Sequence, residues 1–271
     1  WSMPLLMREL LDYYGSPTRI DTAEPAPSYR DYLAWLQRQD TDTAKRAWAQ
    51  AFADVDSPTR VARGAGADGH TSATEVSAEL TADRFDRLRR VVSDTAVTVN
   101  TALAAAWALN LRVLTGETDV IFGSAVSGRP PELPMVDRTL GMFLNTVPVR
   151  VHLDPTTPIR QLLTRIQDRH AHLLDHHHIG LPEIHRSIGV TELFDTAIAY
   201  QSFPLDRSTL QHLVDSAGLR VDDITGIDAT PYPLSLIVAP KHDDHGDTQG
   251  LQIPLRFLDT EFDTAHARRI L

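Results

Sequence analysis

The sequence contains no cysteine among its 271 residues. This absence excludes disulfide bridges, thiolate metal sites and a cysteine nucleophile. Positive charge is also in deficit, because 26 lysines and arginines stand against 36 aspartates and glutamates, for a formal net charge of -10. Proteins that bind a phosphate backbone rely on basic residues that release counterions. Nucleic acid is therefore not an expected partner.

Long apolar runs are missing as well. No stretch of the sequence approaches the roughly 18 apolar residues that a membrane-spanning helix needs. We therefore expect no membrane partner and a cytoplasmic location. The Gly-x-Ser-x-Gly nucleophile elbow is also absent, since Ser127 before Gly128 lacks that setting. A conventional serine hydrolase is disfavoured for this reason.

What is present is enough apolar material for a substantial core, with hydrophobic residues making up 42% of the chain. Apolar residues at helical spacing predict helices over residues 4–14, 28–53 with a break near 40–42, 82–93, 99–114 and 159–175. Apolar runs and alternation predict strands over residues 72–80, 120–126, 196–203, 234–239 and 251–258. Helices interleaved with strands indicate an α/β sandwich.

The helix patterns also predict which faces are buried. Helix 99–114 is apolar on nearly every side, so we expect it in the middle of the domain, ending at Gly116. Thr81 and Thr157 are expected as N-caps of the helices that follow them. The glycine- and alanine-rich residues 63–68 predict a linker. The expected apolar stripes are Phe85, Leu88, Val91 and Val92 in one helix, and Ile159, Leu162, Leu163, Ile166, Leu173 and Leu174 in another.

A long loop and the strand after it, residues 127–150, form the most informative stretch. The loop is rich in proline, and the strand carries one polar pair, Asn145 and Thr146, inside an apolar run. A buried amide or hydroxyl without a partner costs roughly 1–3 kcal/mol, so this pair must find partners if it is buried. The pair either makes structural hydrogen bonds at a strand bend or lines a substrate passage.

Four segments in this sequence occur in a fixed order. The first reads Tyr29-Arg30-Asp31-Tyr32-Leu33-Ala34-Trp35. The second is the strand motif formed by Gly141, Phe143, Leu144, Asn145, Thr146 and Arg150. The third is Leu173-Leu174-Asp175-His176-His177-His178 with Leu181-Pro182-Glu183-Ile184, and the fourth is Leu193-Phe194-Asp195-Thr196, continuing to Phe203-Pro204. Together they closely resemble the motifs of nonribosomal peptide synthetase condensation domains.

The resemblance implies the chloramphenicol acetyltransferase-like fold, an α/β two-layer sandwich, mostly its C-terminal lobe. It divides the chain into residues 1–62, the end of an N-terminal lobe with connecting helices, and residues 63–271, a C-terminal lobe incomplete at its C-terminus. The family's His-His-x-x-x-Asp-Gly signature is followed by a segment similar to Trp1-Ser2-Met3-Pro4-Leu5. We therefore expect the chain to be a fragment, inactive alone, with the catalytic histidine upstream of Trp1.

The resemblance also implies the chemistry of the intact domain, in which an aminoacyl thioester on one carrier protein attacks an acyl or peptidyl thioester on another. The implied partners are donor and acceptor peptidyl carrier protein domains, the missing N-terminal lobe and an adjacent adenylation domain. No cofactor is expected to bind directly, because phosphopantetheine arms deliver the substrates. Much of the rate should come from proximity, since amine and thioester are mutually reactive. The products expected of such a synthetase are antibiotics or siderophores.

Seven residues follow as candidate lining of the substrate tunnel. The resemblance assigns Asn145 and Thr146 to the wall, and Ser127 and Arg129 to the loop that closes the floor. It places Ser235 near the acceptor side. Trp1 and Ser2 are expected beside the reaction centre. A purely architectural role remains the alternative for each of them.

The histidine run His176-His177-His178 permits two other interpretations. A metal site is disfavoured, because neither a His-Glu-x-x-His pattern nor a nearby carboxylate set accompanies it. The run is not the catalytic pair, because no Asp-Gly follows at the family's spacing. Two other functions of the whole chain stay open: a non-catalytic recruitment domain of a glycopeptide assembly line and an epimerisation domain.

Overall fold

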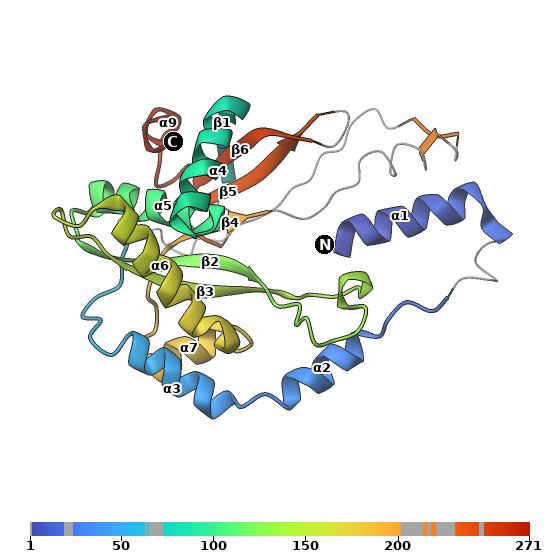
Figure 1. Cartoon of the computed structure of the whole chain (residues 1–271), viewed down its shortest axis with the longest axis horizontal. Coiled ribbons are helices and arrows are strands. Elements are labelled where there is room, and N and C mark those ends of the chain that lie inside the picture. The colour runs from blue at the N-terminus through green and yellow to red at the C-terminus, as the bar shows by residue number, and fades with distance from the viewer. Residues whose placement is uncertain are drawn as a thin grey trace.

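A twisted mixed sheet forms the centre of the computed structural model, which describes residues 2–18, 24–62, 64, 73–201, 214–215, 218–220, 231–243 and 247–271 (Figure 1). Within these residues, six strands pair in the order β1-β6-β5-β4-β2-β3. Their bounds are β1 Ala73–Thr81, β2 Asp119–Ser127, β3 Leu144–His152, β4 Thr196–Tyr200, β5 Leu234–His242 and β6 Thr248–Leu258.

Strand β4 pairs in parallel with β2 on one side and β5 on the other, while the remaining pairs are antiparallel. The β2–β3 ladder runs from Asp119 opposite His152 to Ser127 opposite Leu144. The loop that follows β2 therefore returns directly to the start of β3. Because β2 and β4 run in parallel, the C-terminal end of β4 also lies toward this loop.

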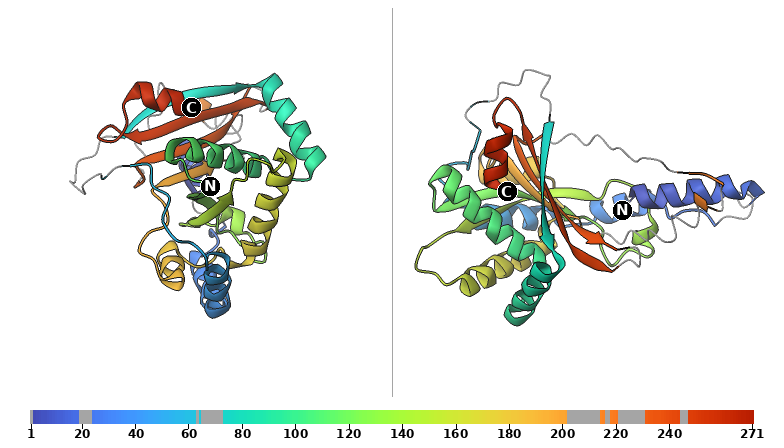
Figure 2. Two further views of the ribbon diagram at one scale, coloured as in Figure 1. Left: turned by 90° about the vertical axis from the view of Figure 1, so that its left-hand side faces the viewer. Right: turned by 90° about the horizontal axis from the view of Figure 1, so that it is seen from above.

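Three helices cover one face of the sheet: α4 Ala82–Thr95, α5 Val99–Thr115 and α6 Ile159–Leu173 (Figures 1 and 2). Helix α5 lies in the middle, since it contacts α4, α6, β2 and β4. It begins at Thr98, whose side chain accepts a hydrogen bond from the N–H of Thr101, and ends at Gly116 with φ 78°. The short helix α9, Thr264–Ile270, packs beside β1.

Helices α3, Thr41–Ala51, and α7, Leu181–Ile188, lie below the sheet in Figure 1, and a second apolar cluster forms there. It joins both helices to strands β2 and β3. Trp48 of α3 is fully buried there, and its indole N–H donates to the carbonyl of His176 at 3.0 Å. Helix α3 starts at Asp40, whose carboxylate accepts from the N–H of Thr43.

Helix α2, Tyr29–Gln37, lies beside the loop between β2 and β3, while α1, Ser2–Gly15, extends away from the body at the end opposite to α9 (Figures 1 and 2). Short 3-10 helices include η2 at Val136–Arg138 and η3 at Leu174–His176. The predicted break near residues 40–42 is confirmed, because α2 ends at Gln37 and α3 begins at Thr41.

Several details of the predicted helix faces are wrong. Val91, Ile159 and Leu174 were expected in the apolar stripes, but their side chains are 49%, 55% and 56% exposed. Ile159 is the first residue of α6 and Leu174 lies beyond its end in η3, so both stand at the ends of their stripe. Thr157 does not cap α6, because Pro158 occupies the N-cap position, and Thr81 caps α4 without a side-chain hydrogen bond.

Two further sequence expectations concern residues that the structure covers in part. Of the expected linker 63–68, only Gly64 lies within the described residues, and Phe203 and Pro204 lie outside them. In the described chain, no single helix has the length and apolar character of a membrane span. One pair, Ala82–Thr95 with Val99–Thr115, passes that test by length and composition only, and it is bent by 103°.

Candidate functional site

The first two sequence motifs meet in an aromatic cluster between α2 and the loop before β3. The ring of Phe143 lies 5.2 Å from that of Tyr29 and 4.6 Å from that of Tyr32, measured between centroids. The hydroxyl of Tyr29 donates to the carbonyl of Met142 at 2.6 Å. Gly141 lies against this cluster, because a Cβ atom there would be 2.1 Å from Cδ2 of Tyr29. The glycine of the strand motif is thus required by close packing.

Arg129 holds the loop between β2 and β3 in shape. Its guanidinium donates to the carbonyls of Val136 and Thr139 and lies 4.1 Å from the centroid of the Phe143 ring. Burial lowers the pKa of Arg129 from its ordinary value, and the carboxylate of Asp137 opposes that shift. Arg129 thus braces the loop through backbone carbonyls and an aromatic ring.

Ser2 fastens the start of α1 to the same loop. Its hydroxyl donates to the carbonyl of Gly141 at 2.8 Å and accepts from the Gly141 N–H at 3.1 Å. Arg129 also donates to this hydroxyl at 3.4 Å. The sequence predicted these two residues in one site, and the structure brings them together across 127 positions of sequence.

An open cavity of about 620 Å³ lies where α1, the loop, and the ends of β2 and β4 converge. Ser2, Ser127 and Arg129, three of the predicted tunnel residues, line it. The remaining wall is largely apolar. It is formed by Ala125, Val126, Gly141, Met142, Phe143, Leu144, Ala199, Tyr200 and Gln201.

Tyr200 and Gln201 were not predicted from the sequence. Tyr200 ends β4 and Gln201 follows it; β4 is remote in sequence from β2 but pairs with it in parallel. Their position at the C-terminal end of a parallel strand is the one signal that could have indicated them, since ligands often bind at such ends. Burial raises the pKa of Tyr200.

Asn145 and Thr146 do not line this cavity. The amide of Asn145 donates to the carbonyls of His177 and Ile179, both at 2.8 Å, and its oxygen accepts from the N–H of Thr146 at 2.9 Å. Thr146 hydrogen-bonds to Tyr232, which lowers the pKa of that phenol against the larger rise caused by burial. The side chain of Asn145 therefore holds strand β3 to the histidine-rich segment by hydrogen bonds to its backbone carbonyls.

The other two predicted residues lie elsewhere. Ser235 is buried on β5, opposite Ala197 of β4 and Arg256 of β6, and it is not among the residues that line the cavity. Trp1 lies outside the described residues. The structure thus gathers three of the seven predicted residues around one cavity.

Arg150, the last residue of the strand motif, ties three elements together. Its side chain is 9% exposed and contacts Asp119 of β2 at 2.6 Å and Asp54, beyond α3, at 2.5 Å. These carboxylates raise the pKa of Arg150, and in return the Arg150 hydrogen bond lowers the pKa of Asp54. Arg150 does not line the cavity that contains Ser2, Ser127 and Arg129, and it serves as a structural anchor.

Asp195 of the fourth motif, next to β4, anchors the segment that follows α3. Its carboxylate accepts from the backbone N–H of Val61 at 3.0 Å and of Ala62 at 2.9 Å. Thr59 in the same segment forms a parallel bridge with Phe194. Burial raises the pKa of Asp195, whereas the backbone hydrogen bonds oppose that rise.

The histidine run lies away from the cavity, after α6. His177 is 8% exposed, and its ring lies 5.0 Å from that of His170, between centroids. Burial, reinforced by the neighbouring histidines, lowers the pKa of His177 to about 3. Among the described residues, no group of three or more His, Cys, Asp or Glu could hold a metal ion.

The low pKa of His177 predicts a loss of stability in acid. In the unfolded chain His177 takes up a proton below a pKa of about 6.5, whereas in the folded protein it stays neutral down to a pH of about 3. Stability should therefore fall as the pH drops from about 6.5 toward 3, by about 2 kcal/mol at pH 5. Urea unfolding at pH 7 and pH 5 measures this, with His177→Gln expected to flatten the dependence and the exposed-site change His152→Gln to retain it. Equal slopes for His177→Gln and wild type would contradict the assignment.

Comparisons with known proteins agree with this geometry. A family model described as the condensation domain matches residues 1–271. A linear gramicidin synthase protein of Brevibacillus parabrevis is 30% identical over 282 residues, covering 100% of this chain and 4% of that protein. Chondramide synthase cmdD of Chondromyces crocatus is 32% identical over 246 residues, covering 89% of this chain and 6% of that protein. The chain thus spans a small part of the length of these curated relatives.

Solved structures show the same fold. The X-domain from teicoplanin biosynthesis superimposes with a TM-score of 0.77 at 20% identity, covering 99% of this chain and 64% of that one. The first condensation domain of the CDA synthetase gives a TM-score of 0.69 at 18% identity, with 99% and 58% covered. The predicted chloramphenicol acetyltransferase-like α/β sandwich is therefore confirmed. With a family match that runs from the first residue to the last, the chain belongs to the condensation domain family of nonribosomal peptide synthetases.

Proposed function

We propose that this chain forms part of the wall and floor of the passage in which a condensation domain joins two carrier-bound thioesters. The observation that carries the proposal is the cavity lined by Ser2, Ser127 and Arg129, in a chain that matches the family model throughout. In the proposed reaction, the acceptor amine forms a C–N bond to the donor carbonyl carbon. The C–S bond breaks, and the amine proton leaves as the thiol is released.

The chemistry of the cavity suits positioning rather than proton transfer. None of the described residues that line it is a carboxylate or an imidazole. We propose that the catalytic imidazole comes from residues upstream of Trp1, as the resemblance implies. The cavity would then hold the reacting ends close together, and a misplacement of about 1 Å can cost about 100-fold in rate.

The organisation and partners follow from the same proposal. We infer that residues 63–271 make up most of a C-terminal lobe and that residues 1–62 connect it to an N-terminal lobe. Donor and acceptor carrier domains, with phosphopantetheine arms, and an adenylation domain would act beside it in the cytoplasm. Relatives named as synthases of linear gramicidin and chondramide support a peptide product.

The experiment compares variants of the polypeptide that contains this chain, with donor and acceptor thioesters loaded on their carrier proteins. Asn145→Ala should slow amide formation about 10- to 100-fold while the Kd for the carrier proteins changes less than about twofold. The reason is that β3 loses its hydrogen bonds to the carbonyls of His177 and Ile179. Asn145 lies only two residues after Phe143, which lines the cavity. Asn110→Ala, the same change on α5, is the matched control.

The same assay separates the other candidate functions. This chain alone should form no amide, and turnover by it would refute an imidazole from upstream. A normal rate with folded Asn145→Ala would show that the hydrogen bonds of Asn145 do not position the cavity wall. An intact polypeptide that forms no amide but binds a partner enzyme would support recruitment instead, and inversion of a substrate centre without amide formation would support epimerisation.

A further inference from the structure

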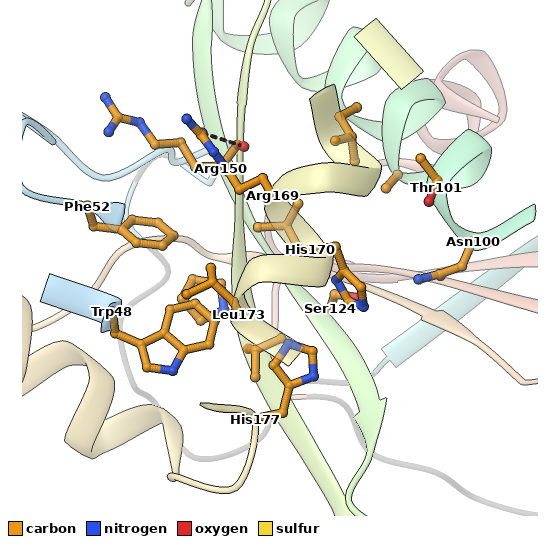
Figure 3. Close-up of a pocket in the computed structure, with 15 residues that line it drawn as sticks. Trp48, Phe52, Asn100, Thr101, Ser124, Arg150, Arg169, His170, Leu173 and His177 are labelled. Carbon is orange, nitrogen blue, oxygen red and sulfur yellow. Dashed lines mark hydrogen bonds between the residues drawn. The ribbon is translucent and has the colours of Figure 1, made fainter. Parts of the chain in front are cut away.

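A second, smaller cavity of about 30 Å³ lies between α3, α5, α6 and strands β2 and β3 (Figure 3). It shares no lining residue with the candidate site. Its apolar wall includes Trp48, Phe52 and Leu173, which belong to the packed body of the protein. The cavity is thus a separate feature of the fold.

Polar side chains from several segments line this small cavity. They include Asn100 of α5, Ser124 of β2, His170 of α6 and His177 beyond η3, and the lining also contains Thr101, Arg150 and Arg169, all labelled in Figure 3. Ser124 is 3% exposed and His177 is 8% exposed. Nε2 of His177 is fully buried and has no hydrogen-bond partner among the described residues.

An unpaired buried imidazole nitrogen is costly. Leaving a buried donor or acceptor unsatisfied destabilises a protein by about 1–3 kcal/mol, and nearly all such groups in proteins have a partner. His177 also cannot gain a partner by moving outward, because its segment is fixed on both sides. The carbonyls of His176, His177 and Ile179 accept hydrogen bonds from Trp48 and Asn145.

The size and chemistry of the cavity select its ligand. A water molecule needs roughly 10–15 Å³ of such volume and two to four polar partners, whereas organic ligands occupy pockets of roughly 300–1,000 Å³. A volume of about 30 Å³ suits one or two waters. A structural metal needs about four ligands, and no group of three or more His, Cys, Asp or Glu gathers in the part of the chain that the structure describes.

We propose that this cavity is a hydration site, in which one or two ordered water molecules hydrogen-bond to Nε2 of His177 and link it to Ser124 and His170. The water completes the hold on residues 176–179, whose carbonyls already anchor α3 and β3. The site therefore supports the start of β3 through the segment to which Asn145 is hydrogen-bonded. This role does not depend on any reaction in the larger cavity.

A crystal structure of the wild-type chain at about 1.8 Å tests this directly. We expect electron density for water within hydrogen-bond distance of Nε2 of His177. In solution, oxygen-17 relaxation dispersion should count about one or two fewer long-lived waters in His177→Phe than in wild type. His152→Phe, the same change at an exposed position, should leave the count unchanged.

Two outcomes would overturn the proposal. One is a dry cavity in the wild-type density with equal water counts in all three proteins. The other is a tightly bound zinc ion at His170 and His177, detected by titration with zinc chloride and by anomalous scattering. Should His177→Phe fail to fold, Ser124→Ala serves as the second variant, and the wild-type density still decides.

Discussion

Replacing Gly141 with alanine should destabilise the protein by about 3 kcal/mol, near the upper end for overpacking in a well-packed region. The added Cβ would lie 2.1 Å from the ring of Tyr29, which cannot simply turn away. That ring is held by the hydrogen bond from its hydroxyl to Met142 and by contacts with Tyr32 and Phe143. Urea unfolding monitored by tryptophan fluorescence measures the loss.

A second substitution isolates the cause. In a Tyr29→Ala background the overlap is gone, so adding Gly141→Ala should cost less than about 1 kcal/mol. Gly180→Ala is the matched control, because its Cβ would meet only Pro182 at 3.7 Å, an ordinary contact. If Gly141→Ala costs the same with and without Tyr29, close packing against the ring is not the reason for glycine at this position.

Replacing Arg150 with alanine should destabilise the protein by about 2–3 kcal/mol. The guanidinium is buried and hydrogen-bonds to Asp119 and Asp54, so its removal leaves a cavity and unpaired carboxylates. The loss is held below that of a fully buried pair because both carboxylates reach solvent, with side chains 36% and 83% exposed. Thermal or chemical unfolding gives the value.

Arg60→Ala is the matched control for this change. Its partner contact with Glu192 is between side chains that are 54% and 44% exposed, so the expected loss is within about 1 kcal/mol. Arg150→Lys should recover only part of the stability, because an ammonium cannot reproduce the forked contact with Asp119. Equal losses for Arg150→Ala and Arg60→Ala would show that burial of the ion pair is unimportant.

The elements that the sequence predicted best are those with a strong local signal. Helix α5 and strand β2 are nearly continuous apolar runs; β2 is largely buried, and α5 buries seven of its 17 residues but leaves Leu109 and Val113 exposed. The errors occurred where burial depends on a neighbour. Val91 and Ile159 continue apolar stripes, yet they are 49% and 55% exposed, so the packing of distant elements leaves them uncovered.

The candidate site was also predictable only in part, because some of its residues are brought together by contacts between distant segments. The family resemblance indicated Ser2, Ser127 and Arg129, and the structure places all three at one cavity. It could not indicate Tyr200, because its approach to β2 depends on a parallel pairing between segments far apart in sequence. Nor could it assign the bonds of Asn145, whose acceptors lie 32 and 34 residues away.

The sequence by itself determined the family, the order of most helices and strands, and the residue types that the site contains. Those properties depend on local periodicity and on motifs read along the chain. The tertiary structure alone decided which of those residues share a cavity, which ones brace the backbone, and that His177 lies buried beside a small polar cavity. These outcomes depend on contacts between distant segments, whose distances and burial arise only when the sheet and its helices pack together.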